Sequence, residues 1–297
     1  MSFAPRSRLL ALLAALAVTA ALAACGSSAG GTSHSSGSKA PVAVLYAGSL
    51  VDLMEKQVSP TFKSATGYSV NGFSGGSSAL ATQITGKVRR GDVFISASPK
   101  VTDTLLGAAN DSWVSFYATF ATSGLVLGYS SHSKFAADLT SKPWYDVITE
   151  QGFRIGTTDP ATDPKGKLAA QALGDTATAK NLPALKAISS DTKNVFPEET
   201  LVGRLQSGQL DAGFFYASEA KAGNIATVPL TGVDLKASYT ISILKGAPNE
   251  KGAEAFVAYL LGTAGKAAMT KDGFSLVSPA KLTGSGVPAS LQSLFAD

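Results

Sequence analysis

Apolar residues are concentrated first at the N-terminus of the 297-residue chain. Residues 1–8 are basic, and residues 9–24 are apolar except for Thr19. This apolar run is shorter than the roughly 20 residues that a bilayer-spanning helix needs. The pattern therefore predicts a secretory signal peptide over residues 1–24, with a basic n-region followed by an apolar h-region.

A polar segment rich in glycine and serine follows over residues 25–39, and it begins with the single cysteine of the chain, Cys25. Residues 22–25, Leu-Ala-Ala-Cys, resemble a bacterial lipobox, whose cysteine becomes the lipid-modified first residue of the mature protein. Gly/Ser-rich composition makes a flexible tether and cannot build a core. We expect lipidation at Cys25 and a folded part anchored to the outer face of the cytoplasmic membrane without spanning it. The alternative is an ordinary signal peptide that ends near a buried cysteine.

From residue 40 onward, short β-rich runs alternate with amphipathic segments, which predicts an α/β fold. The expected strands cover residues 41–46, 68–73, 92–96, 125–129, 153–156, 212–216 and 239–244. The expected helices cover residues 50–62, 80–88, 164–173, 181–188, 198–207, 250–261 and 264–271. In the first of these helices, Leu50, Leu53, Met54, Val58 and Phe62 share one face.

Composition excludes several classes of function. The net charge is +4, but Arg6 and Arg8 lie in the predicted signal peptide, so the remainder carries only +2 and does not indicate a nucleic-acid partner. One cysteine excludes an internal disulfide framework and a multi-cysteine metal cluster. The two histidines, His34 and His132, lie in polar stretches, and no nucleophile-elbow, phosphate-loop or zinc-protease motif is present. We therefore expect a protein that is not an enzyme.

Two Gly-Ser turns follow the first two expected strands. Ser49 and Ser77 (or its neighbour Ser78) come where a helix begins. Unpaired backbone N–H groups at a helix N-terminus favour an anion, and the carboxyl ends of strands gather at the ligand-binding edge of an open α/β sheet. Each serine is equally explained as a plain helix N-cap. Together the two turns indicate either an anion site or two ordinary caps.

The segments VLYAGSL and FSGGSSAL around these turns resemble the periplasmic molybdate/tungstate-binding proteins of ABC importers. The resemblance covers about residues 42–274 and keeps the order of the family's signatures. The matching segments are residues 91–98, a stretch from Trp144, residues 159–166, and residues 211–220. The resemblance implies the two-lobed class II periplasmic-binding-protein fold, with a ligand cleft between lobes. It places one lobe at residues 40–117 plus 235–297 and the other at 118–234.

The resemblance also implies a binding site and its partners. The family's two serines fall on Ser49 and Ser77, its anion-facing backbone N–H on Lys165, and its tyrosine hydroxyl on Tyr216. We expect the Lys165 ammonium to be solvated, because such sites use neutral donors. The cargo would be molybdate or tungstate, with no cofactor. The protein would be a monomer that delivers this cargo to an ABC permease.

Two further positions separate the branches of this family. The tungstate-type branch has carboxylates that ligate the metal, and in this chain those positions hold Asp163 and Glu198, with Glu199 as the alternative if the register slips by one residue. Both carboxylates are also explained as helix-start residues. Beside a bound dianion, the negative charges of these two carboxylates need compensation. It could come from bonding to a Mo(VI) or W(VI) centre or from a proton on the ligand, and sulfate has no such proton.

Other functions remain open at this point. The same fold could serve as a receptor for another ligand, such as phosphate or an iron(III) complex. From different classes come a secreted α/β hydrolase, which the absent general base disfavours, and a surface lipoprotein that binds no oxyanion.

Overall fold

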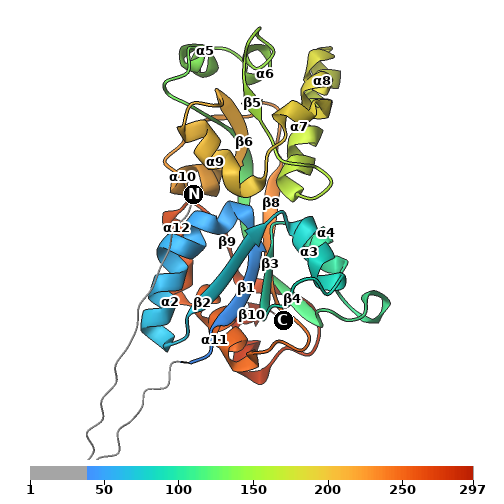
Figure 1. The fold of residues 1–297 in the computed structure, drawn as a ribbon, viewed down its shortest axis with the longest axis vertical. Coiled ribbons are helices and arrows are strands. Elements are labelled where there is room, and N and C mark those ends of the chain that lie inside the picture. Colours follow the sequence, from blue (N-terminus) through green and yellow to red (C-terminus); the bar gives the residue numbers. More distant parts are fainter. Residues whose placement is uncertain (1–38, 297) are drawn as a thin grey trace, which may run out of the picture. The chain divides into compact units, whose positions relative to one another are not determined.

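The computed structural model describes residues 39–296. The predicted signal peptide, Cys25 and almost all of the predicted tether lie outside the described residues. The described part is an α/β fold with two lobes, as predicted, and Figure 1 shows them one above the other. Where the two lobes are divided in sequence stays a prediction.

The larger lobe is built on a mixed sheet. Its strand order is β10-β9-β4-β8-β3-β1-β2. The strands are β1 Val42–Ala47, β2 Val70–Gly75, β3 Val93–Ser96, β4 Phe116–Tyr129, β8 Lys236–Ile243, β9 Ser275–Gly284 and β10 Phe295–Ala296. The β1 strand runs parallel to β2 and β3, whereas β8 is antiparallel to β3 and β4.

The smaller lobe shares strand β4 with the larger one. Residues 118–124 of β4 pair with β8, and residues 125–129 pair with β6 Ala212–Tyr216. Two short strands complete this sheet: β5 Ile155–Gly156, parallel to β6, and β7 Ala226–Pro229, antiparallel to β4. A single strand therefore passes from one lobe into the other (Figure 1).

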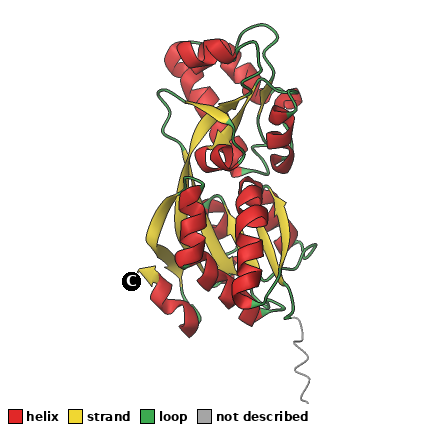
Figure 2. Ribbon diagram, turned by 90° about the vertical axis from the view of Figure 1, so that its left-hand side faces the viewer, coloured by secondary structure: helices red, strands yellow, loops and turns green. Residues whose placement is uncertain are grey.

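Helices cover the sheets (Figure 2). Those of the larger lobe are α1 Val51–Leu53, α2 Ser59–Thr66, α3 Ser77–Thr85, α4 Pro99–Asp103, α11 Glu250–Leu261 and α12 Thr263–Lys271. Those of the smaller lobe are α5 Ala136–Ser141, α6 Trp144–Val147, α7 Pro164–Lys180, α8 Ala184–Ser190, α9 Glu198–Gln206 and α10 Ala217–Ala222.

Burial on both faces explains why β1 reads as a continuous apolar run. Val44 and Tyr46 belong to one hydrophobic cluster, whereas Leu45 between them belongs to a second cluster with α3 and α4. Successive strand residues point to opposite faces, so this strand is apolar on both. The predicted apolar face of residues 50–62 is also buried, although a π-helical stretch, Met54–Val58, separates α1 from α2.

Several expected boundaries were wrong. The helix expected at 164–173 continues to Lys180 and ends where Asn181 adopts a left-handed conformation, with φ of 54°. The next helix begins at Ala184 because Pro183 precedes it. Strand β4 starts nine residues before the expected 125, and β9 was missed because most of its side chains are polar or partly exposed.

Candidate functional site

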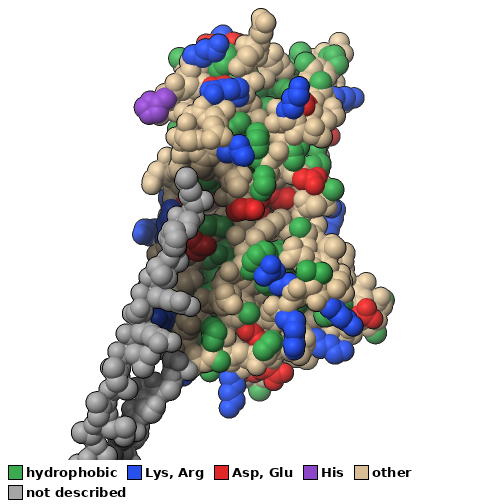
Figure 3. Space-filling model, in the orientation of Figure 1, with side chains coloured by type: hydrophobic (Ala, Val, Ile, Leu, Met, Phe, Trp, Pro, Cys, Tyr) green, Lys and Arg blue, Asp and Glu red, His purple; other side chains and the backbone are tan. Residues whose placement is uncertain are grey.

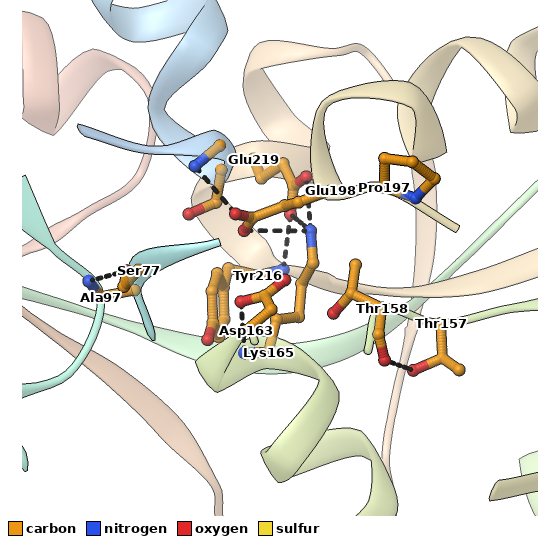
Figure 4. A network of polar contacts seen from close by, with 12 residues as sticks. Ser77, Ala97, Thr157, Thr158, Asp163, Lys165, Pro197, Glu198, Tyr216 and Glu219 are labelled. Atoms are coloured by element: carbon orange, nitrogen blue, oxygen red, sulfur yellow. Dashed lines mark hydrogen bonds and ion pairs between the residues drawn. The ribbon is translucent and has the colours of Figure 1, made fainter. Parts of the chain in front are cut away.

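The six residues implied by the resemblance lie at the junction of the two lobes, and Figure 4 labels five of them, all except Ser49. Ser49 lies in the 3₁₀ turn Gly48–Leu50 after β1, and Ser77 is the first residue of α3 after β2. From the smaller lobe come Asp163 and Lys165 at the start of α7, Glu198 at the start of α9, and Tyr216 at the end of β6. All six side chains are buried. The site is thus assembled from helix starts and strand ends of both lobes.

Asp163 is the N-cap of α7, as its sequence context allowed. Its Oδ1 accepts a hydrogen bond from the backbone N–H of Lys165 at 2.9 Å. Its Oδ2 is buried and has no hydrogen-bond partner. Capping therefore accounts for one oxygen of this carboxylate and leaves the other without a structural role. The Lys165 N–H, expected to face an anion, donates to this cap, and its role toward an anion stays a prediction.

Glu198 connects the two lobes. Its Oε2 accepts a hydrogen bond from the backbone N–H of Gly48 at 2.8 Å, across 150 residues of sequence. Its Oε1 has no hydrogen-bond partner and lies 3.5 Å from the Lys165 Nζ. The neighbouring Glu199 is exposed. The geometry therefore places Glu198, rather than Glu199, in the buried cluster.

The expectation of a solvated Lys165 ammonium was wrong. The Lys165 side chain is fully buried, with 0% exposure, and its Nζ donates to both oxygens of Glu219, at 2.8 and 2.9 Å. A buried ammonium is retained only when it is paired, and Glu219 supplies that pairing. The resemblance had shown only a backbone role at this position and gave no sign of this partner.

Hydroxyl groups complete the cluster. The Ser77 Oγ accepts a hydrogen bond from the Ala97 backbone N–H at 3.0 Å, so its own proton remains available to donate. The Ser49 Oγ lies 3.1 Å from the hydroxyl of Tyr239 on β8. The Tyr216 hydroxyl is buried without a partner, and its ring packs edge-on against Tyr239.

Sequence reasoning missed Glu219 and Tyr239. Glu219 lies three residues after Tyr216, and its Oε2 accepts from the Tyr216 backbone N–H at 3.3 Å. A glutamate three residues after a helix N-cap has the spacing of a capping box, and this spacing in the sequence could have indicated Glu219. Tyr239 lies in an expected strand, and a buried tyrosine hydroxyl requires a partner.

Burial dominates the electrostatics of the site. It raises the pKa of Asp163, of Glu219 and, most strongly, of Glu198, whose ionised form is also opposed by the neighbouring carboxylate of Asp163. Burial alone would lower the pKa of Lys165, but the surrounding carboxylates outweigh it and raise that pKa. The Tyr216 phenol has a pKa raised well above its ordinary value by burial, so it stays a neutral donor.

Unpartnered polar atoms gather at this junction. Six buried side-chain N or O atoms lack a hydrogen-bond partner within the described part of the chain. Five of them belong to the cluster: Thr158 Oγ1, Asp163 Oδ2, Glu198 Oε1, Tyr216 OH and Ser218 Oγ. Buried polar groups are satisfied in most native proteins, so such a concentration indicates a place for a polar ligand.

Two hollows adjoin the cluster. A small cavity of about 150 Å³ is lined by residues that include Gly48, Ser49, Glu198 and Glu219. A larger cleft of about 980 Å³ lies between α3, α4 and α7, and its lining includes Ala97 and Pro164. Figure 3 shows acidic side chains at the level where the lobes meet.

Two negative findings concern residues 39–296 alone. None of their helices combines the length and the apolar character needed to cross a membrane. In the same range, no group of three or more His, Cys, Asp or Glu side chains is arranged to hold a metal ion.

Comparisons with known proteins show the family to which the chain belongs. The family model described as "Bacterial extracellular solute-binding protein" matches residues 42–275. An uncharacterized solute-binding protein from Petrotoga mobilis is 27% identical over 80% of this chain and 84% of its own length. A protein from Thermococcus kodakarensis, named molybdate/tungstate-binding protein WtpA, is 26% identical over 96% of both chains.

Solved structures show the same fold. The periplasmic molybdate-binding protein of Azotobacter vinelandii superposes with a TM-score of 0.60 at 22% identity, covering 80% of this chain and 99% of that one. The family model spans most of the described residues and includes every residue of the candidate site. The chain therefore belongs to the family of bacterial extracellular solute-binding proteins.

Proposed function

We propose that this protein captures molybdate or tungstate outside the cytoplasmic membrane and delivers it to an ABC permease. The observation that carries the proposal is the pair of buried carboxylate oxygens without a hydrogen bond, Asp163 Oδ2 and Glu198 Oε1, beside buried hydroxyl donors. The names of the Thermococcus and Azotobacter proteins support this choice of ligand. The proposed roles are hydrogen bonding for Ser49, Ser77 and Tyr216 and metal ligation for Asp163 and Glu198.

The chemistry of these groups selects among oxyanions. Hydroxyl groups donate to the oxygens of an anion, and each hydrogen bond to a charged group contributes roughly 1.5–3 kcal/mol. A carboxylate repels those oxygens but can bond directly to a hard, highly charged metal centre. Sulfate offers no such centre and no proton, so Asp163 and Glu198 disfavour it. Hydrogen phosphate, which could donate its proton to a carboxylate, is the second candidate.

Binding would also favour the closed arrangement of the lobes. The serines belong to the larger lobe, whereas Asp163, Glu198 and Tyr216 belong to the smaller one. A ligand that contacts both sets stabilises the state in which they are close. We propose that the permease recognises this closed state, which would make delivery depend on cargo.

Lipid anchoring at Cys25 is the proposed means of keeping the receptor beside the permease. The support is the Leu-Ala-Ala-Cys sequence and the Gly/Ser-rich segment behind it. A Cys25→Ser variant expressed in a bacterium with the lipidation machinery should leave the membrane fraction. If the variant stays membrane-bound, another segment anchors the protein.

Calorimetric titration of the purified protein with tungstate, molybdate, sulfate and phosphate at neutral pH tests the ligand. We expect tight binding of the first two and none of sulfate. Ser49→Ala and Glu198→Ala should weaken this binding, whereas Glu199→Ala, which removes the adjacent exposed carboxylate, should not. Binding of phosphate alone would recast the carboxylates as proton acceptors. Unchanged tungstate affinity in the Ser49 and Glu198 variants would refute the assigned site.

A further inference from the structure

The ammonium of Lys165 has a complete set of partners. An ammonium has three donor hydrogens. Two of them serve the Oε1 and Oε2 atoms of Glu219, at 2.8 and 2.9 Å, and Glu198 Oε1 lies at 3.5 Å. The Lys165 and Glu198 side chains are 0% and 1% exposed, so water does not compete for these contacts. The ammonium is therefore committed to carboxylates and is not available as a direct clamp on an anion.

The three carboxylates of the cluster are not equivalent. Glu219 uses both oxygens, one on Lys165 and the other on Lys165 and the Tyr216 N–H. Asp163 and Glu198 each keep one buried oxygen without a hydrogen bond. Glu219 is thus the counter-ion of the lysine, whereas Asp163 and Glu198 each keep one oxygen that no hydrogen bond occupies, and that of Glu198 lies in a longer ion pair with the ammonium.

Lys165 also joins three helix starts. It is the second residue of α7, Glu219 lies in the first turn of α10, and Glu198 is the first residue of α9. Glu198 in turn accepts from Gly48 in the other lobe. Figure 4 shows the Lys165 side chain extending between Glu198 and Glu219. The position of Glu198 Oε1 therefore depends on where Glu219 holds the ammonium.

We propose that Lys165 and Glu219 form a positioning pair that holds the Glu198 carboxylate for bonding to the metal centre of the oxyanion. The pair thereby sets selectivity for anions whose centre accepts extra oxygen ligands over anions whose centre does not. This inference rests on the proposed function. Neither Lys165 nor Glu219 contacts the ligand through its side chain in this arrangement.

Removing either member of the pair has a distinct effect. In Glu219→Gln the ammonium keeps its charge but loses its counter-ion, so it moves toward Glu198 Oε1 and competes with the metal centre for that oxygen. In Lys165→Met the carboxylates of Glu198 and Glu219 repel each other without compensation. Loss of a residue that orients a metal ligand typically weakens metal affinity by roughly 10–100-fold. We expect a tungstate affinity loss of this size in each variant.

The experiment combines titration with X-ray absorption at the tungsten L3 edge. The variants are Lys165→Met, Glu219→Gln and the double variant, which removes both charges and serves if a single variant does not fold. Lys180→Met is the matched control, since Lys180 is exposed at the far end of the same helix. We expect fewer oxygen neighbours around tungsten in the three test variants than in the wild type, with a smaller tungstate-to-sulfate affinity ratio. The control should match the wild type in both.

The outcomes separate this inference from the proposed function. A wild type that binds none of the oxyanions refutes both. A wild type that binds tungstate without added oxygen neighbours refutes metal ligation by Glu198 and the positioning role with it. If folded variants lose only thermal stability, while coordination number and affinity ratio stay those of the wild type, Lys165 and Glu219 are merely structural and the inference is overturned.

Discussion

Gly76 of the larger lobe lies against the backbone of the smaller lobe. An added Cβ at Gly76 would lie 2.5 Å from the carbonyl oxygen of Thr162 and 3.2 Å from the Cβ of Asp163. The backbone of Gly76, with φ of −58° and ψ of 130°, is one that alanine adopts freely. Gly76→Ala should therefore leave the larger lobe unstrained and act only on the approach of the two lobes.

The size of the effect follows from the distances. Real Cβ contacts are not shorter than 3.0 Å, so Thr162 must retreat by at least 0.5 Å in Gly76→Ala. The Ala79 N–H donates to the same Thr162 oxygen at 3.1 Å, and this hydrogen bond would break. Asp163 is the next residue, so its carboxylate moves away from Ser77. A ligand held by Asp163 would then lose the hydrogen bond proposed from Ser77. Losing one hydrogen bond to a charged ligand costs roughly 1.5–3 kcal/mol, which is about a tenfold to 100-fold loss of affinity.

The assay is calorimetric titration with tungstate, together with thermal unfolding without ligand. Gly75→Ala is the matched control, because its added Cβ would meet only Leu80 at 3.5 Å, an ordinary contact. We expect Gly76→Ala to bind weakly with a nearly unchanged Tm, and Gly75→Ala to bind like the wild type. Equal tungstate affinity in Gly76→Ala and wild type would show that the bound state does not use this closed contact.

Three further outcomes are expected. Tyr216→Phe removes a buried hydroxyl that has no partner, so titration should show at least tenfold weaker oxyanion binding while the Tm does not fall. Tungstate at about 100 times its Kd should stabilise the wild type by about 2.7 kcal/mol, seen as a higher Tm that equal sulfate does not produce. Asp211 accepts three hydrogen bonds from Arg154, which outweigh burial and lower its pKa. Asp211→Asn should therefore cost about 2 kcal/mol of unfolding free energy at pH 7. Because this stabilisation exists above the unfolded pKa of about 3.9 and is lost below the folded pKa, denaturant curves of variant and wild type should converge in acid.

The local pattern of the sequence was sufficient for most of the elements. The strand over 212–216 and the helix over 250–261 have the bounds that the sequence predicts. Each is specified by residues close in sequence: an apolar run between polar turns, or an apolar face at helical spacing. The helix starts at Pro164 and Glu198 were equally local, because capping residues and proline mark them.

Strands β9 and β10 and the first part of β4 were not predictable in this way. Strand β9 is largely polar or partly exposed, and it exists because β4 offers it backbone partners. Such pairing depends on residues more than 100 positions away and leaves no periodic signal in the strand itself. A mostly polar segment such as β9 therefore resembles a loop in sequence, although it forms a strand in the structure.

For the candidate site, the sequence by itself determined which side chains stand at helix starts and strand ends, among them Ser49, Ser77, Asp163 and Glu198. Only the tertiary structure decided that Lys165 is buried, that Glu219 is its counter-ion, and that Glu198 reaches Gly48 in the other lobe. The reason is physical. A cap depends on the backbone a few residues away, whereas burial and charge compensation depend on which helix starts converge, and that is set by the packing of the two lobes.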